Sequence, residues 1–182
     1  MSKAIGMIEF KTISTGLMAA DTMVKTADVE LIEAQIVCPG KYIAIIAGNL
    51  SAVKSAVDAA AIHYEEQLID SFVLGNPHES IFPAIYGTTK VETIDALGIL
   101  ETYDAASIIV AADIAAKTAI VNLIEIRVAK GMCGKSYLHL TGEVAAVEAA
   151  IQKAKQSVAE KGMFLDAAVI PHPDKQICES IL

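Results

Sequence analysis

The sequence Ala19-Ala20-Asp21-x-x-x-Lys25-x-Ala27-x-Val29-x-Leu31 decides the fold, because it occurs twice in this chain. The second copy begins at Ala111 and repeats each of these residues at an offset of 92. A shorter motif, Ala4-x-Gly6-x-x-Glu9, returns at the same offset as Ala96-x-Gly98-x-x-Glu101. A repeat at a fixed offset indicates that the chain consists of repeated structural units, even before its individual helices and strands are assigned. The 182 residues therefore predict two small domains of the same fold.

The repeat also indicates where the two domains meet. Two extra residues, Met132 and Cys133, change the offset to 94, so that Gly48 corresponds to Gly142. The polar stretch at residues 87–92 is typical of a short linker. We therefore expect a first domain at residues 1–90 and a second at residues 91–182.

Hydrophobic periodicity predicts the same order of elements in both halves. In the first half we expect strands at residues 5–10, 29–37, 42–47 and 71–74, a helix at residues 14–26 capped by Thr12 or Ser14, and a helix after Asn49. In the second half, Asp104 is the expected cap of the first helix, Gly162 ends the second helix, and the last strand covers residues 164–170. This order predicts an α+β fold in which helices cover one face of each sheet.

The turn between the second and third strands holds Cys38, the most chemically capable residue of the chain. Pro39 has a fixed φ, and Gly40 can adopt the positive φ that the third position of a type II turn requires. This pattern predicts a type II turn that holds the thiol outward at the rim of the sheet. Such a thiol can ligate a metal, act as a nucleophile or remain inert, and the turn alone does not decide among these roles.

Composition and charge exclude several classes of protein. Hydrophobic residues make up 54% of the chain, but the most apolar stretch, residues 105–119, is interrupted by Asp113 and Lys117. It is too short and too charged for a membrane span of about 20 residues, so we expect the excess apolar surface to lie in a core or between subunits. The net charge of −8, without any cluster of Lys and Arg, argues against nucleic acid. The N-terminus lacks a secretory signal, which favours a reducing, cytosolic setting with free thiols.

No arrangement typical of an enzyme is visible, so we expect the chain not to be one. The sequence has no phosphate loop, dinucleotide fingerprint or closely spaced cysteine pair. We interpret Glu9 and Glu101 as structural. The four histidines are scattered: His139 should face away from Leu138 and Leu140, whereas His78 and His172 fall in corresponding surface loops, and His63 has no evident partner.

The duplicated motifs resemble those of bacterial microcompartment shell proteins, in the tandem-domain form that assembles as trimers. The resemblance covers almost the whole chain and implies two ferredoxin-like sandwich variants per chain, a pseudo-hexameric homotrimer, and a place in a shell beside other shell proteins. It also implies that two turns line a central pore, formed by Cys38, Pro39, Gly40 and Lys41 in the first half and by Lys130, Gly131, Met132, Cys133, Gly134 and Lys135 in the second. Lys25 and Lys117 would contact neighbouring tiles, the alternative being that they are solvated lysines near a helix end.

The first turn further resembles that of the T-type shell proteins of propanediol-utilisation compartments, whose pore cysteine binds an iron–sulfur cluster. The resemblance implies a [4Fe-4S] cluster held by Cys38 of three subunits, electron transfer across the shell, and a redox partner enzyme. Soft thiolates suit such a cluster, which normally takes four ligands. Cys133 could add ligands, whereas we interpret Cys178 as a small apolar residue. The alternatives are a plain tile whose pore conducts small metabolites, and a thiol enzyme or trimeric ligand sensor, which the missing base and the short loops disfavour.

Overall fold

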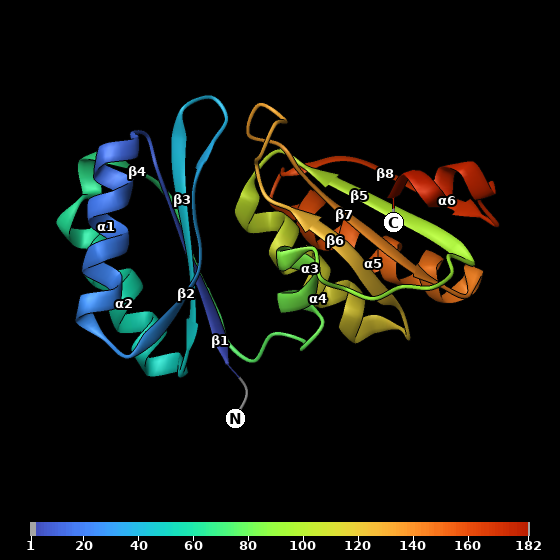
Figure 1. Ribbon diagram of the computed structural model, residues 1–182, viewed down its shortest axis with the longest axis horizontal. Coiled ribbons are helices and arrows are strands. Elements are labelled where there is room, and N and C mark those ends of the chain that lie inside the picture. Colours follow the sequence, from blue (N-terminus) through green and yellow to red (C-terminus); the bar gives the residue numbers. More distant parts are fainter. Residues whose placement is uncertain (1–2, 182) are drawn as a thin grey trace. The chain divides into compact units, whose positions relative to one another are not determined.

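The computed structural model describes residues 3–181, which form two compact units that divide between Pro77 and His78 (Figure 1). The first unit is a four-stranded antiparallel sheet of order β2-β3-β1-β4, with two helices on one face. Its elements are β1 (Ala4–Phe10), α1 (Ile13–Thr26), β2 (Val29–Val37), β3 (Lys41–Gly48), α2 (Leu50–His63), the short 3-10 helix η1 (Glu65–Gln67) and β4 (Leu68–Leu74).

The second unit repeats this architecture and adds a short helix before and after it. Its elements are α3 (Ile81–Tyr86), β5 (Ala96–Thr102), α4 (Ala105–Thr118), β6 (Asn122–Arg127), β7 (Ser136–Gly142), α5 (Val144–Glu160), β8 (Phe164–Pro171) and α6 (Lys175–Ile181). The sheet order β6-β7-β5-β8 is that of the first unit, element for element. The predicted α+β fold in two tandem units is therefore confirmed.

A glycine in the central strand of each sheet explains why the Ala-x-Gly motif occurs twice. A Cβ added to Gly6 would lie 2.7 Å from Val53 Cγ1, and one added to Gly98 would lie 2.8 Å from Val147 Cγ1. Real Cβ atoms do not approach other carbons so closely, because interiors are already packed to crystal-like density. Glycine thus lets α2 and α5 lie directly against β1 and β5.

The helix ends agree with the sequence except in one detail. Asp104 caps α4 by accepting a hydrogen bond from the Ser107 N–H, as predicted. Thr12 occupies the same position before α1, but its side chain makes no capping hydrogen bond. Gly162 follows α5 with a φ of +72° and donates its N–H to the Ala159 carbonyl, as expected of the residue that ends a helix.

Several elements and bounds differ from those that the sequence predicts. β4 begins at Leu68, three residues before the predicted strand, and α3 and α6 were not predicted. Residues 78–90, which the sequence placed with the first domain, include α3, and α3 packs against β6 and α4 of the second unit. Among residues 3–181, no helix is both long and apolar enough to cross a membrane.

Candidate pore turns and assembly surfaces

The turn between β2 and β3 presents Cys38 at the rim of the first sheet. The Gly40 N–H donates to the Val37 carbonyl at 2.9 Å, so Cys38 and Pro39 are the central residues of the turn, and the peptide bond between them is cis. The predicted type II turn, with Pro39 and Gly40 in the centre, is therefore wrong. Gly40 does adopt the anticipated positive φ, at +96°. Cys38 is half-buried, whereas Pro39 and Gly40 are exposed.

The corresponding turn of the second unit is longer and holds Cys133 at an exposed position. Cys133 has a φ of +54° between Gly131 and Gly134, both of which also have positive φ. The base of this turn is fixed by a buried hydrogen bond, in which the Ala129 N–H donates to Ser136 Oγ at 2.9 Å. The two thiols thus belong to turns of different length and conformation.

All three cysteines are free thiols, as predicted from the composition. Within residues 3–181 of one chain, no three side chains of His, Cys, Asp or Glu are gathered in a way that could hold a metal ion. Cys178 lies half-buried on α6, with its Sγ 3.7 Å from the Pro173 carbonyl.

Lys41 begins β3 beside Cys38 and forms an ion pair with Glu9. Lys41 Nζ lies 2.8 Å from Glu9 Oε1, with 29% of the Lys41 side chain exposed and only 5% of the Glu9 side chain. The interpretation of Glu9 as structural fits this contact. This pairing was not predicted from the sequence, although Glu9 faces Ile43 in the register and Lys41 lies on the diagonal two residues away. Much of the Lys41 charge is consequently compensated within its own unit.

Lys25 and Lys117, the predicted edge lysines, pair within their helices in the same way. Each contacts the aspartate four residues earlier, Asp21 at 2.6 Å and Asp113 at 2.7 Å. The surroundings differ, because Asp113 is buried whereas Asp21 is exposed. Equivalent residues of the two units therefore have different degrees of exposure.

The outer face of the second sheet, opposite its helices, carries a polar cluster that the sequence analysis did not identify. Tyr137 donates its hydroxyl proton to Glu125 Oε2 at 2.6 Å, and Arg127 donates to Glu125 Oε1 at 2.7 Å. The His139 ring lies 4.5 Å from the Tyr137 ring. Alternation along β6 and β7 places these four residues on one face, and this spacing was the signal available in the sequence.

Burial shifts the pKa of two side chains in this cluster. Desolvation, followed by the hydrogen bond to Glu125, raises the pKa of Tyr137 to about 12. Desolvation lowers the pKa of His139, so its imidazole stays neutral near pH 7. Leu138 and Leu140 are fully buried, so His139 faces away from them, as predicted. The corresponding positions in the first unit are Glu33, Gln35, Ile43 and Ile45.

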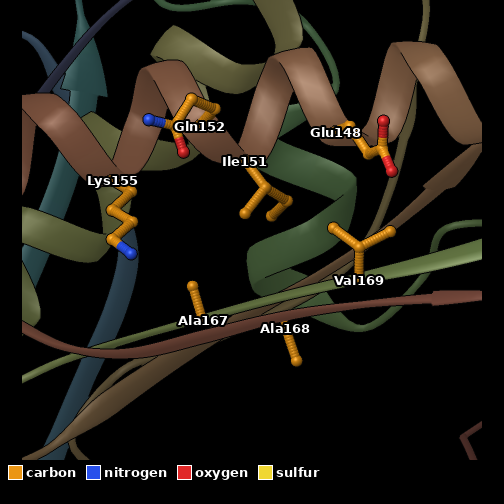
Figure 2. A pocket seen from close by; sticks show the side chains of 7 residues that line it. All are labelled: Glu148, Ile151, Gln152, Lys155, Ala167, Ala168 and Val169. Atoms are coloured by element: carbon orange, nitrogen blue, oxygen red, sulfur yellow. The ribbon is translucent and has the colours of Figure 1, made fainter.

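A shallow groove lies between the second long helix and the last strand of each unit. In the second unit it lies between α5 and β8, has a volume of about 430 Å³, and is lined by Glu148, Ile151, Gln152, Lys155, Ala167, Ala168 and Val169 (Figure 2). A groove of about 460 Å³ occupies the corresponding place between α2 and β4. Because it occurs in both units with different polar side chains, the groove is a feature of the fold.

Comparison with known proteins identifies the class to which this chain belongs. Residues 4–77 and residues 96–173 each match the BMC domain, so the chain belongs to the BMC domain family. It is 38% identical over 177 residues to the bacterial microcompartment shell protein PduT of Citrobacter freundii, covering 97% of this chain and 96% of that protein. It is 28% identical to the carboxysome assembly protein CcmO of Synechococcus elongatus, covering 98% of this chain and 68% of that one.

A solved structure has the same fold over nearly the full length. The crystal structure of a microcompartment protein from Desulfitobacterium hafniense DCB matches with a TM-score of 0.95 and 44% sequence identity, covering 98% of this chain and 99% of that one. The chain is thus a tandem-domain microcompartment shell protein. Proteins of this family are structural, and the prediction that the chain is not an enzyme is confirmed.

Proposed function

We propose that this protein is a shell tile that closes as a homotrimer and holds an iron–sulfur cluster, of the [4Fe-4S] type, through Cys38 of three copies. The observation that carries the proposal is the half-buried thiol of Cys38, which lies in the turn between β2 and β3 of a protein with two BMC domains. Similarity to a microcompartment shell protein over nearly its full length supports the role in a shell.

The chemistry of the turn fits an iron–sulfur cluster. Cysteine thiolate is the usual protein ligand of such clusters, and three copies supply three ligands, leaving one iron for another donor. The cluster, when bound, would supply one-electron transfer across the shell toward a redox partner enzyme. The turn of this chain would position Cys38, and the compensated Lys41–Glu9 pair would place little net positive charge beside it. Cys133 is less suited to hold the cluster, because its turn is longer and its thiol is exposed.

Iron and acid-labile sulfide, measured on anaerobically purified protein, test the proposal. We expect about four irons and four sulfides per three chains, with visible absorbance from sulfur-to-iron charge transfer. Cys38→Ser should lose this iron, whereas the matched variant Cys133→Ser should retain it. Protein that remains free of iron after reconstitution, or iron that persists in Cys38→Ser, would contradict the proposal and favour a plain tile with a metabolite pore.

A further inference from the structure

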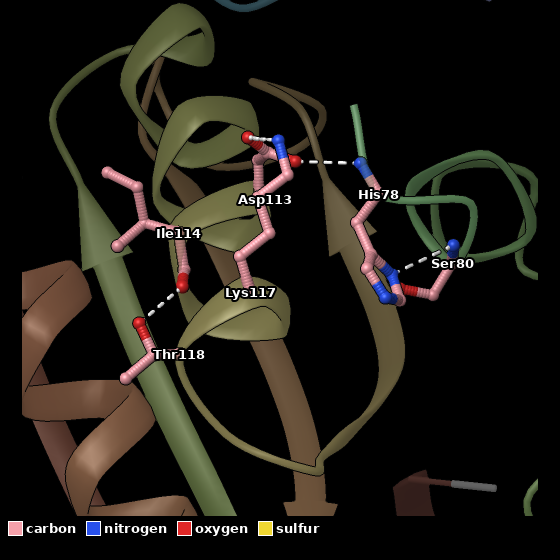
Figure 3. Close-up of polar contacts among 6 residues, drawn as sticks. All are labelled: His78, Ser80, Asp113, Ile114, Lys117 and Thr118. Carbon is pink, nitrogen blue, oxygen red and sulfur yellow. Dashed lines mark hydrogen bonds and ion pairs between the residues drawn. The ribbon is translucent and has the colours of Figure 1, made fainter. Parts of the chain in front are cut away.

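The short helix α3 lies at the start of the second unit. It follows β4 in the chain and packs against β6 and α4, with Ile81 fully buried. The His78 N–H donates to Asp113 Oδ1 at 2.7 Å, while Asp113 Oδ2 pairs with Lys117 at 2.7 Å (Figure 3). His78 Nδ1 lies 2.7 Å from Ser80 Oγ, which fixes the start of this segment. An apolar contact and a buried aspartate thus hold α3 in place.

The helix α6 is the counterpart of α3, but in this chain it is exposed. It follows β8, and Ile177 corresponds to Ile81 at an offset of 96. Ile177 exposes 47% of its surface, whereas Ile81 exposes none. The same offset aligns Asp174 with His78. The Asp174 N–H is therefore the counterpart of the His78 N–H, which donates to Asp113.

The counterpart of the surface under α3 is also exposed. β2 and α1 correspond to β6 and α4, and Leu31 of β2 is 44% exposed where Leu123 of β6 is fully buried. Val24 of α1 is exposed, whereas its counterpart in α4, Ala116, is buried. Asp21 and Lys25 pair as Asp113 and Lys117 do. One chain therefore exposes both α6 and the face of α1 and β2. These are the counterparts of α3 and of the face of α4 and β6, which pack together in the second unit.

We propose that residues 174–181 of one copy dock on α1 and β2 of the next copy, and so close the ring of three. Ile177 would cover Leu31 and Val24, and Asp21 would accept a hydrogen bond from the Asp174 N–H of the neighbour. This inference rests on the proposed homotrimer and names the residues at its joints. A second copy is the occupant because this chain already makes the contact once, and Ile177, Leu31 and Asp21 repeat Ile81, Leu123 and Asp113 at the same repeat positions.

Disulfide trapping tests the joint directly. Ile177→Cys and Leu31→Cys are combined in a chain that also carries Cys38→Ser, Cys133→Ser and Cys178→Ser, so that only the new thiols can pair. Oxidation should give bands of two and three linked chains on a non-reducing gel. A control that pairs Ile177→Cys with Ile120→Cys should stay unlinked, because Ile120 is 95% exposed and lies outside the proposed joint. A band of single-chain mass with altered mobility, or no linkage at all, would overturn the inference.

Sedimentation of point variants separates this inference from the proposed homotrimer. Ile177→Asp and Asp21→Ala should each weaken trimer formation, with Ile177→Asp raising the dissociation constant about tenfold or more because a charge replaces a buried apolar side chain. Ile120→Asp should leave it unchanged, and circular dichroism should show that all three fold. A wild-type protein that sediments as a single chain would contradict the homotrimer itself. A wild-type trimer that Ile177→Asp does not weaken would contradict only the joint described here.

Discussion

Replacing Lys41 by methionine should destabilise the first unit, because it leaves the Glu9 carboxylate buried without its partner. The Glu9 side chain is 5% exposed and lies 2.8 Å from Lys41 Nζ. Removing one member of a fully buried ion pair costs about 3–5 kcal/mol. Because 29% of the Lys41 side chain is exposed, water reaches this pair from one side, and we expect a smaller loss. A loss of about 2–3 kcal/mol in the free energy of unfolding is the resulting magnitude.

The double variant Glu9→Gln, Lys41→Met should recover most of that loss, because it buries a neutral amide instead of a charge. We expect a coupling free energy of about 1–2 kcal/mol between the two positions, in the range typical of contacting residues. The assay is urea unfolding followed by far-UV circular dichroism, with hydrogen exchange at β1 and β3 to show that the effect lies in the first unit.

The matched control is Lys135→Met, which changes the corresponding lysine of the second unit. Lys135 is exposed, and a substitution at such a position usually changes stability by less than about 0.5 kcal/mol. Equal effects of Lys41→Met and Lys135→Met, or a double variant as unstable as Lys41→Met alone, would refute the reasoning that the Glu9 charge depends on Lys41.

Three further predictions follow from local contacts. Asp104→Ala should lower the free energy of unfolding by about 1 kcal/mol, whereas Thr12→Ala should cost less, because only Asp104 makes a capping hydrogen bond; equal losses in urea melts would contradict this. Gly16→Ala should lower the melting temperature by several degrees, because its Cβ would clash with Tyr42 Cβ, while Gly75→Ala, with its nearest contact at 3.6 Å, should have little effect. The raised pKa of Tyr137, about 12, predicts a contribution to stability that is complete below the unfolded value near 10 and is lost as the pH rises toward 12. Urea midpoints of Tyr137→Phe should therefore fall less steeply over this range than those of the wild type, and parallel curves would argue against it.

The fold could be predicted from the sequence because two copies constrain each other. Gly6 and Gly98 recur where a helix meets the central strand, and Asp104 caps α4, so local residues determined these elements. The type of turn at Cys38 could not be predicted, since Pro39 is compatible with either central position and the hydrogen bond from Gly40 to Val37 decides between them. The helix α3 was not predicted, because its six residues show too little periodicity. Its position also depends on β6 and α4, which lie far along the chain.

Only part of the candidate site could be predicted from the sequence, for the same reason. Cys38 stood out because proline and glycine follow it directly, whereas the Glu9–Lys41 pair joins residues that are 32 positions apart. Residues 125–139 carry the polar cluster on the second sheet, but its members meet only when β6 and β7 pair. The repeat itself concealed this cluster, because the corresponding residues Ile43 and Ile45 of the first unit are apolar.

Native mass spectrometry of anaerobically purified protein tests the central claim most directly, because it weighs the chains and the cluster together. The claim predicts one dominant species with the mass of three 19.2 kDa chains and a single [4Fe-4S] cluster, which falls to the bare mass of three chains in Cys38→Ser. A dominant single chain, or a trimer whose bound mass is the same in the wild type and in Cys38→Ser, would contradict it.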